Sequence, residues 1–245
     1  LRNRYPNFVT RILDMEQTND GRIFLALSSG GLISIKNGKI RPYDSKVLNN
    51  VVTSLSLYKG DLLVANSNSV YRITDQKLQL FGNFDGIRNL VTIENDKLAI
   101  LSSQGVYITD GTDTQKYVVD EQSLNSTYDI EIWNDEYLVA TEAGLGKLKE
   151  GKIVRYDALE LGRNPAYSIM RDSENNLWVG TNDGIFKTDG KELIQYNKGN
   201  GLIGNEINRN ALVEDTKGDI WIGTDAGVSV LENSEEINTD FIPNI

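Results

Sequence analysis

Neither cysteine nor histidine occurs among the 245 residues of the chain. Without cysteine there can be no disulfide bond, no thiolate metal site and no cysteine nucleophile. Without histidine there can be no Ser-His-Asp triad, no histidine general base and no histidine-ligated metal. Any chemistry of this chain would therefore depend on carboxylate, tyrosine, lysine or arginine side chains.

Long apolar runs and blocks of like charge are missing as well. No hydrophobic stretch approaches the ~20 residues of a membrane helix. The 25 basic and 35 acidic residues are scattered and give a formal net charge of −10, which argues against a surface for nucleic acid or anionic lipid. We expect no nucleic-acid partner, and contact with a membrane only through segments outside this chain.

What the chain has instead is one short phrase in six copies. The phrase is a polar turn, an apolar run, a small residue, a polar pair, a glycine and another apolar residue. Its clearest copies are residues 175–185 and 218–228. Self-similarity at a period of about 40 residues indicates an array of equal supersecondary units. The second apolar residue of each copy recurs at intervals of 39, 36, 39, 40 and 43 residues: Phe24, Leu63, Ala99, Leu138, Trp178 and Trp221.

Each unit is predicted to be a four-stranded antiparallel meander. Its apolar runs are short and bounded by Gly, Asn, Asp and Ser, which is typical of strands. No stretch has a sustained helical period. A single meander cannot bury both of its faces, but meanders stacked around an axis can. We therefore predict an all-β fold, a β-propeller of four-stranded blades with the first strand innermost, as one domain over residues 1–245.

The two ends of the array are predicted to complement each other. An aromatic residue ends the fourth strand of a unit, and Tyr5 stands 19 residues before Phe24, much as Tyr43 stands 20 before Leu63. Residues 1–7 would then form the outer strand of the blade that contains Trp221 and close a six-bladed ring. The alternative is that the six repeats are part of a seven-bladed ring.

Residues 172–185 and 215–228 resemble the two-component regulator propeller repeat, and residues 200–207 resemble the connector between such repeats. This resemblance implies a periplasmic sensor region of a hybrid two-component histidine kinase, as in gut Bacteroidetes. In that family paired propellers precede an Ig-like module, a membrane helix and the kinase, and residues 232–245 would lead into that module.

Structural roles are expected for the repeated residues. Asp172 and Asp215 stand at turn starts, where an aspartate accepts hydrogen bonds from the backbone amides of its own turn. Trp178 and Trp221 are predicted to pack between adjacent blades. Gly184 is expected to supply a positive φ or a close approach between strands.

Function is expected in the loops of one face, where a propeller channel opens. The connections between blades carry aromatic, Asn and Arg side chains, which suit carbohydrate hydroxyls and carboxylates. The predicted ligand-binding residues are Arg88, Tyr128, Tyr167, Asn208 and Arg209. No cofactor and no metal is expected.

Three functions are compatible with the sequence. The first is a non-catalytic sensor that binds an oligosaccharide or another ligand, or a second copy of itself. The second is a propeller enzyme, a lactonase-like hydrolase or a polysaccharide lyase, with carboxylates at the channel. The third is an adaptor for protein partners. The carboxylates available to an enzyme are Asp129, Glu131, Asp183 and Glu206.

Overall fold

The computed structural model describes residues 11–28, 31–43, 48, 51–74, 77–94, 96–119, 124, 126–159, 161 and 164–233. Within these ranges the chain forms β-strands joined by short turns, with no α-helix. The 3-10 helix η3 (Lys198–Asn200) is a single short turn. The all-β prediction is confirmed for the part of the chain that is described.

Consecutive strands form groups, which we call blades 1 to 6. Blades 1 to 5 have four strands each, and blade 6 has three described strands. The first three blades are β1 (Ile12–Gln17), β2 (Ile23–Leu27), β3 (Leu32–Lys36) and β4 (Lys39–Tyr43); β5 (Ser54–Tyr58), β6 (Asp61–Ala65), β7 (Ser69–Thr74) and β8 (Lys77–Asn83); β9 (Ile87–Ile93), β10 (Lys97–Ser102), β11 (Gly105–Thr109) and β12 (Thr114–Val119). The last three are β13 (Thr127–Trp133), β14 (Glu136–Thr141), β15 (Gly144–Lys149) and β16 (Lys152–Arg155); β17 (Ala166–Arg171), β18 (Leu177–Thr181), β19 (Gly184–Thr188) and β20 (Leu193–Tyr196); β21 (Ile207–Glu214), β22 (Ile220–Thr224) and β23 (Gly227–Leu231).

Every blade is an antiparallel meander, as the short turns require. One pairing crosses between blades. The outer strands β12 and β16 run parallel, with Val118 opposite Lys152 and Val119 opposite Ile153, and they join blades 3 and 4 into one sheet. The repeat pattern contains no sign of this pairing.

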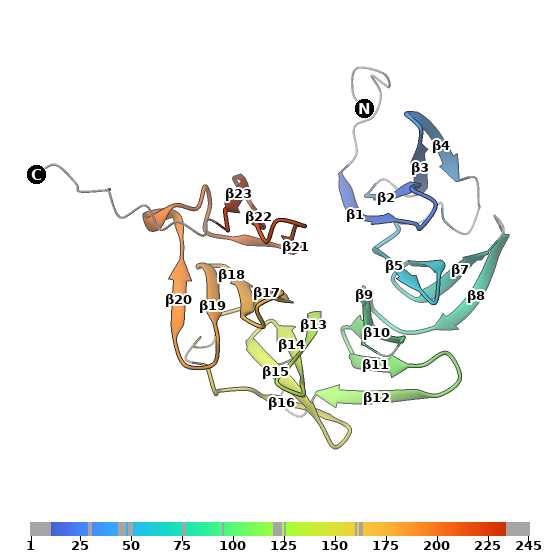
Figure 1. Cartoon of the computed structure of the whole chain (residues 1–245). Helices are drawn as coiled ribbons and strands as arrows, with labels where there is room; N and C mark the ends of the chain where they lie inside the picture. The colour runs from blue at the N-terminus through green and yellow to red at the C-terminus, as the bar shows by residue number, and fades with distance from the viewer. Residues whose placement is uncertain are drawn as a thin grey trace, which may run out of the picture.

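The blades stand around a central axis as the repeats predicted (Figure 1). The first strand of each blade is innermost, and the inner strands are neighbours in the order β1, β5, β9, β13, β17, β21. In Figure 1 the ring is open between the red strands of blade 6 and the blue strands of blade 1.

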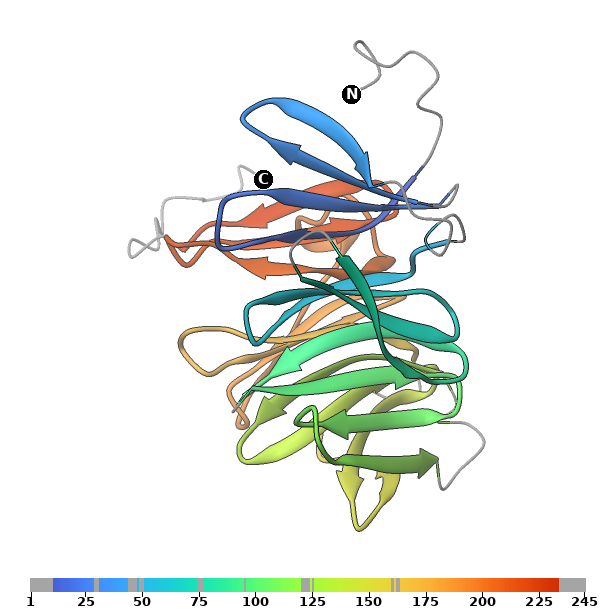
Figure 2. The ribbon, with the colours of Figure 1, turned by 90° about the vertical axis from the view of Figure 1, so that its right-hand side faces the viewer.

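The strands run across the thickness of the ring, so the turns gather on two opposite faces (Figure 2). We call the face where the inner strands begin the entry face. The turns between the second and third strands also lie there. The opposite face, which we call the hairpin face, holds the turns from first to second and from third to fourth strand.

The core lies between the blades. Along the second strand of a blade, alternate residues point to opposite faces of the sheet. The second apolar residue therefore faces the next blade, while its neighbours face the previous one. Phe24 packs against Leu55 and Val64 of blade 2, and Trp178 packs against Ile207 and Ile222 of blade 6. The repeat recurs because each blade buries the same apolar position against the blade that follows it.

The two tryptophans differ in burial. Trp178 is 1% exposed, which confirms its predicted position between blades. Trp221 is 42% exposed, so the same prediction is wrong for it. The reason is that no described blade follows blade 6. Residues that share its face by register, Val213, Val228 and Val230, are exposed too. The predicted closing strand around Tyr5 lies outside the described residues.

The predicted turn roles are confirmed. Asp172 Oδ1 accepts hydrogen bonds from the backbone N–H of Glu174 (3.1 Å) and Asn176 (2.7 Å), and its Oδ2 accepts one from the Trp178 indole (2.8 Å). Asp215 repeats this arrangement with Trp221 at 3.0 Å. One carboxylate therefore ties the turn to the strand that follows it.

Candidate ligand-binding site

A hollow of about 560 Å³ opens on the entry face at the ring centre. Four of the five predicted ligand-binding residues line it: Arg88, Tyr167, Asn208 and Arg209. They converge because each stands near the start of an inner strand, namely β9, β17 and β21. The fifth residue, Tyr128 at the start of β13, is 3% exposed and lies beneath the others.

Stacking holds the predicted residues together. The guanidinium of Arg209 lies over the ring of Tyr128, 4.0 Å from its centroid, and 5.9 Å from the centroid of Tyr167. The two tyrosine rings meet edge to face at 5.7 Å. Cations over aromatic faces are attracted by about 0.5–2 kcal/mol. The stack fixes an exposed arginine at the mouth of the channel.

Arg88 approaches Tyr128 from a neighbouring blade. Its Cζ lies 5.5 Å from the centroid of the Tyr128 ring, and its Nη2 donates a hydrogen bond to Ser126 Oγ at 3.1 Å. Its Nε is buried and, among the described residues, has no hydrogen-bond partner. A buried donor without a partner costs free energy, and most buried polar groups in folded proteins have a partner.

Tyr128 and Asn208 are held by their own surroundings. The Tyr128 hydroxyl donates a short hydrogen bond to Glu142, in the β14–β15 turn. Burial, and then this bond, raise the pKa of Tyr128, so the phenol stays neutral and remains a donor. Asn208 Nδ2 donates to the Thr224 carbonyl at 2.8 Å. The Tyr128 hydroxyl proton and one Asn208 amide N–H are therefore already engaged within the protein.

The hollow also contains charged and amide side chains that were not predicted as ligand-binding residues. Arg11, Glu206 and Asn210 line it with the others. Arg11 immediately precedes β1. Residues at the starts of inner strands meet on the entry face, so the same reasoning applied to the first repeat would have predicted Arg11.

The floor of the hollow is a pair of amides, and an acidic channel lies below it. Asn210 and Asn89 join across the ring, and beneath them a space of about 250 Å³ is lined by two Asp-x-Glu pairs. These pairs are Asp14 with Glu16 on β1, and Asp129 with Glu131 on β13.

The channel carboxylates bond to the next blade. Asp14 Oδ2 accepts from Leu55 N at 2.8 Å, and Asp129 Oδ2 accepts from Ile169 N at 3.0 Å. Burial raises the pKa of Asp129 to about 7, and burial also raises the pKa of Asp14, Glu16 and Glu131. The mouth of the channel, which carries arginines, thus leads to an interior of carboxyl groups whose pKa values are raised by burial.

The four carboxylates named for an enzyme do not all share one space. Asp129 and Glu131 lie in the channel and bond to backbone amides. Glu206 lines the mouth, and Asp183 lies in the β18–β19 turn and lines neither space.

Two segments of the chain match a known repeat. The family described as two component regulator propeller matches residues 160–183 and 201–226, which contain Trp178 and Trp221. The resemblance of these repeats is therefore confirmed. No curated protein matches the chain in sequence.

Solved propeller structures share its fold. The extracellular domain of a protein assigned to a hybrid two component system of B. thetaiotaomicron is 19% identical, with a TM-score of 0.75 over 90% of this chain and 32% of that one. PorZ, an essential surface component of the type-IX secretion system of Porphyromonas gingivalis, is 17% identical (TM-score 0.69, 91% and 38%). Virginiamycin B lyase of Staphylococcus aureus is 14% identical (TM-score 0.69, 94% and 87%).

These similarities establish the β-propeller fold. The chain spans 32% of the B. thetaiotaomicron domain, so it corresponds to one part of that protein. Among the described residues, no helix is both long and apolar enough to cross a bilayer.

Proposed function

We propose that this chain is the ligand-sensing propeller of an extracytoplasmic receptor in a two-component signalling system. It binds an oligosaccharide in the entry-face hollow and has no chemistry of its own. Its place is the periplasm, and a separate domain of the receptor carries the histidine kinase.

The observation that carries this proposal is the stack of Arg88, Arg209, Tyr128 and Tyr167, which come from four different blades. The guanidinium groups donate several hydrogen bonds in a fixed plane, which suits the hydroxyls and carboxylates of sugars. Tyr167 presents a partly exposed ring at the wall of the hollow, and aromatic faces stack on the apolar faces of sugar rings.

The non-catalytic part of the proposal is supported by composition. A structure of virginiamycin B lyase is described as catalytically inactive and carries a histidine-to-alanine substitution. This chain has no histidine. Its channel carboxylates accept backbone hydrogen bonds from neighbouring blades instead.

A ligand in this hollow would contact several blades at once, because the residues that line it come from blades 1, 2, 3, 5 and 6. It could therefore stabilise one arrangement of the blades, or of two copies of the receptor, over another. Only a difference in affinity between two such arrangements can transmit a signal.

The direct test is a thermal-shift screen of a glycan library on the isolated chain. A ligand bound by the folded state raises the melting temperature. We expect a hit whose shift disappears in an Arg88→Ala/Arg209→Ala variant and persists in a Lys77→Ala/Lys191→Ala control that loses the same charge. A shift that survives in the first variant would place the ligand elsewhere, and turnover of a glycan or lactone would exclude the non-catalytic function.

The same question can be asked in the full-length receptor. Arg88→Ala, Tyr167→Ala and Arg209→Ala together leave the buried Tyr128 in place. Signalling should then fail to respond to inducer. A normal response would show that this surface is not the sensing surface.

A further inference from the structure

A second hollow lies on the hairpin face, against blade 1. Its walls come from one face of the sheet, because Phe24 pairs with Ser34 and Ser34 pairs with Arg41 across β2, β3 and β4. Lys36 and Lys39 pair two residues further along and share that face. Arg22 stands two residues before Phe24, so it continues the same row.

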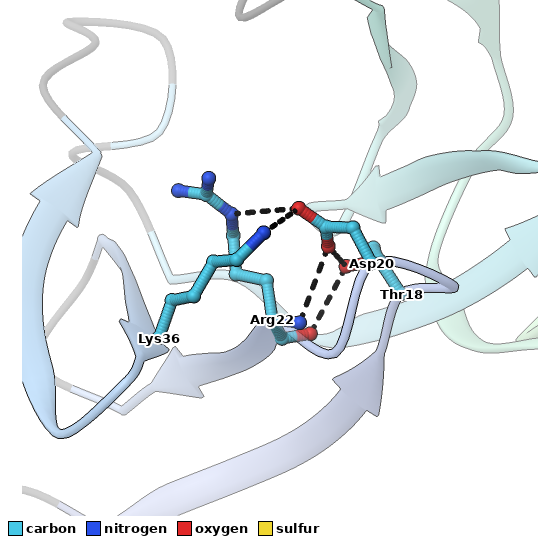
Figure 3. Close-up of polar contacts among 4 residues, drawn as sticks. All are labelled: Thr18, Asp20, Arg22 and Lys36. Carbon is cyan, nitrogen blue, oxygen red and sulfur yellow. Dashed lines mark hydrogen bonds and ion pairs between the residues drawn. The ribbon is translucent and has the colours of Figure 1, made fainter.

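One aspartate arranges two of these cations (Figure 3). Asp20 Oδ2 accepts from Lys36 Nζ at 2.6 Å and lies 3.8 Å from Arg22 Nε. Asp20 Oδ1 accepts from Thr18 Oγ1 at 2.6 Å and from Arg22 N at 3.2 Å. In Figure 3 the two terminal nitrogens of Arg22 point away from Asp20. The carboxylate therefore contacts the backbone N–H and the Nε of Arg22 and leaves the two terminal nitrogens available.

Positive charge dominates the walls. A hollow of about 220 Å³ is lined by Arg22, Ser34, Lys36, Asn37, Lys39 and Arg41, with no acidic residue. The whole chain carries a net charge of −10. Within the described ranges, neither Lys39 nor Arg41 forms an ion pair. A recess lined by one sign of charge concentrates ions of the opposite sign.

A buried hydroxyl and a larger space adjoin these cations. Ser34 is 7% exposed, and its hydroxyl has no hydrogen-bond partner in the part of the chain that the structure describes. Arg22, Ser34 and Arg41 also line a neighbouring hollow of about 470 Å³ that reaches blade 2. Its walls combine Tyr43 and Pro42 with hydroxyl and amide side chains such as Thr18 and Asn19. Two aspartates also line it: Asp20, which bonds to Lys36, and Asp61, which lies 3.7 Å from Arg72.

We propose that this region is a second ligand site, which takes a sulfate or phosphate monoester carried on a small hydroxylated body. The oxyanion occupies the smaller hollow, where the Arg22 and Arg41 forks and the Ser34 hydroxyl donate to it. Asp20 offsets one of the four positive charges, and the excess that remains is matched better by a doubly charged tetrahedral group than by a carboxylate. The hydroxylated body extends into the larger hollow.

The site is separate from the entry-face hollow. It lies on the opposite face of the ring, and the two share no residue. The proposal therefore does not depend on the function proposed for the entry face.

The test is calorimetric titration at fixed low ionic strength with glucose 6-sulfate, glucose 6-phosphate, glucuronate and glucose. We expect binding of at least one of the two esters, weaker binding of glucuronate and none of glucose. The difference between the esters identifies the source of the oxyanion. Binding should weaken as salt is raised, because partly exposed charges are screened.

Variants locate the binding. Lys39→Gln/Arg41→Gln removes two exposed cations of β4 and should weaken ester binding by about tenfold or more. Lys77→Gln/Lys191→Gln removes the same charge elsewhere and should change it less than about twofold. The Arg88→Ala/Arg209→Ala variant should bind as the wild type does. No ester binding by the wild type, equal losses in the two Gln variants, or glucuronate binding as tight as that of the esters would overturn the proposal.

Discussion

Asn89 and Asn210 lie 121 positions apart and exchange two hydrogen bonds across the centre of the ring. Asn210 Nδ2 donates to Asn89 Oδ1 at 3.0 Å, and Asn89 Nδ2 donates to Asn210 Oδ1 at 2.7 Å. Asn89 also accepts from Ser54 Oγ and donates to the Tyr128 carbonyl. This pair links blade 3 directly to blade 6, which are not neighbours in the ring.

The first prediction concerns this pair. Asn210→Ala should lower the free energy of unfolding by roughly 1–2 kcal/mol. Asn89→Ala should lower it by more, because it also leaves the Ser54 hydroxyl and the Tyr128 carbonyl without this hydrogen-bond partner. A double-mutant cycle in urea denaturation should give a coupling energy above about 0.5 kcal/mol. Strict additivity would mean that the two amides do not meet in solution.

The second prediction concerns pH. The folded-state pKa of Asp129 is about 7, above the ~3.9 of an unfolded aspartate. The folded state therefore keeps a proton that the unfolded state has already released, and stability falls as pH rises between these two values. The pKa of Asp14, Glu16 and Glu131 is shifted in the same direction. Stability should thus drop by roughly 1–3 kcal/mol from pH 4 to pH 7 on account of Asp129.

The measurement is urea denaturation across that pH range. Asp129→Asn should flatten the profile, because the amide does not titrate. Asp85→Asn, at an exposed loop position, should leave the slope unchanged. An equally steep profile in the Asp129 variant would assign the pH dependence to other groups.

The third prediction separates the two tryptophans. Trp178 is 1% exposed, so Trp178→Ala should cost about 3–5 kcal/mol. Trp221 is 42% exposed, and Trp221→Ala should cost about 1–2 kcal/mol, since less apolar area returns to water. Both lose one hydrogen bond to an aspartate, so the comparison isolates burial. Equal losses would show that something covers Trp221 in solution.

The fourth prediction concerns the tight β18–β19 turn. Gly184 has φ of 99°, and a Cβ there would lie 2.2 Å from the Tyr196 carbonyl oxygen. Gly184→Ala should therefore destabilise by well over the ~1 kcal/mol that a positive φ costs alone. Gly151→Ala is the control, because its φ is 77° and a Cβ there meets nothing within 4 Å. Similar melting temperatures for the two variants would contradict the predicted clash.

The fold could be predicted because burial repeats. Phe24, Leu63, Leu138 and Trp178 occupy the same position in their blades, and each is buried at the junction with the next blade. Trp221 has the same surrounding sequence and a different exposure. The sequence of a repeat specifies the apolar surface that one blade presents to the next. It does not specify whether another blade covers that surface.

The candidate site was predictable in outline for a similar reason. Inner strands all run in the same direction, so residues near their starts meet, and this rule brought Arg88, Tyr167 and Arg209 together. The cross-ring contact of Asn89 with Asn210 could not be foreseen, because it depends on the width of the ring. The β12–β16 pairing was missed because parallel contact between outer strands leaves no local pattern.

Among the described residues, apolar side chains are exposed on both sides of the opening in the ring. Blade 6 presents Val213, Trp221 and Val228, and blade 1 presents Leu13 and Met15. The two surfaces are of different kinds, so copies that met through them would join head to tail and could keep growing, which is the hazard of heterologous contacts. Repeat proteins avoid this with polar terminal units. The isolated chain should therefore self-associate more as its concentration is raised. Polar substitutions at these positions should reduce that association.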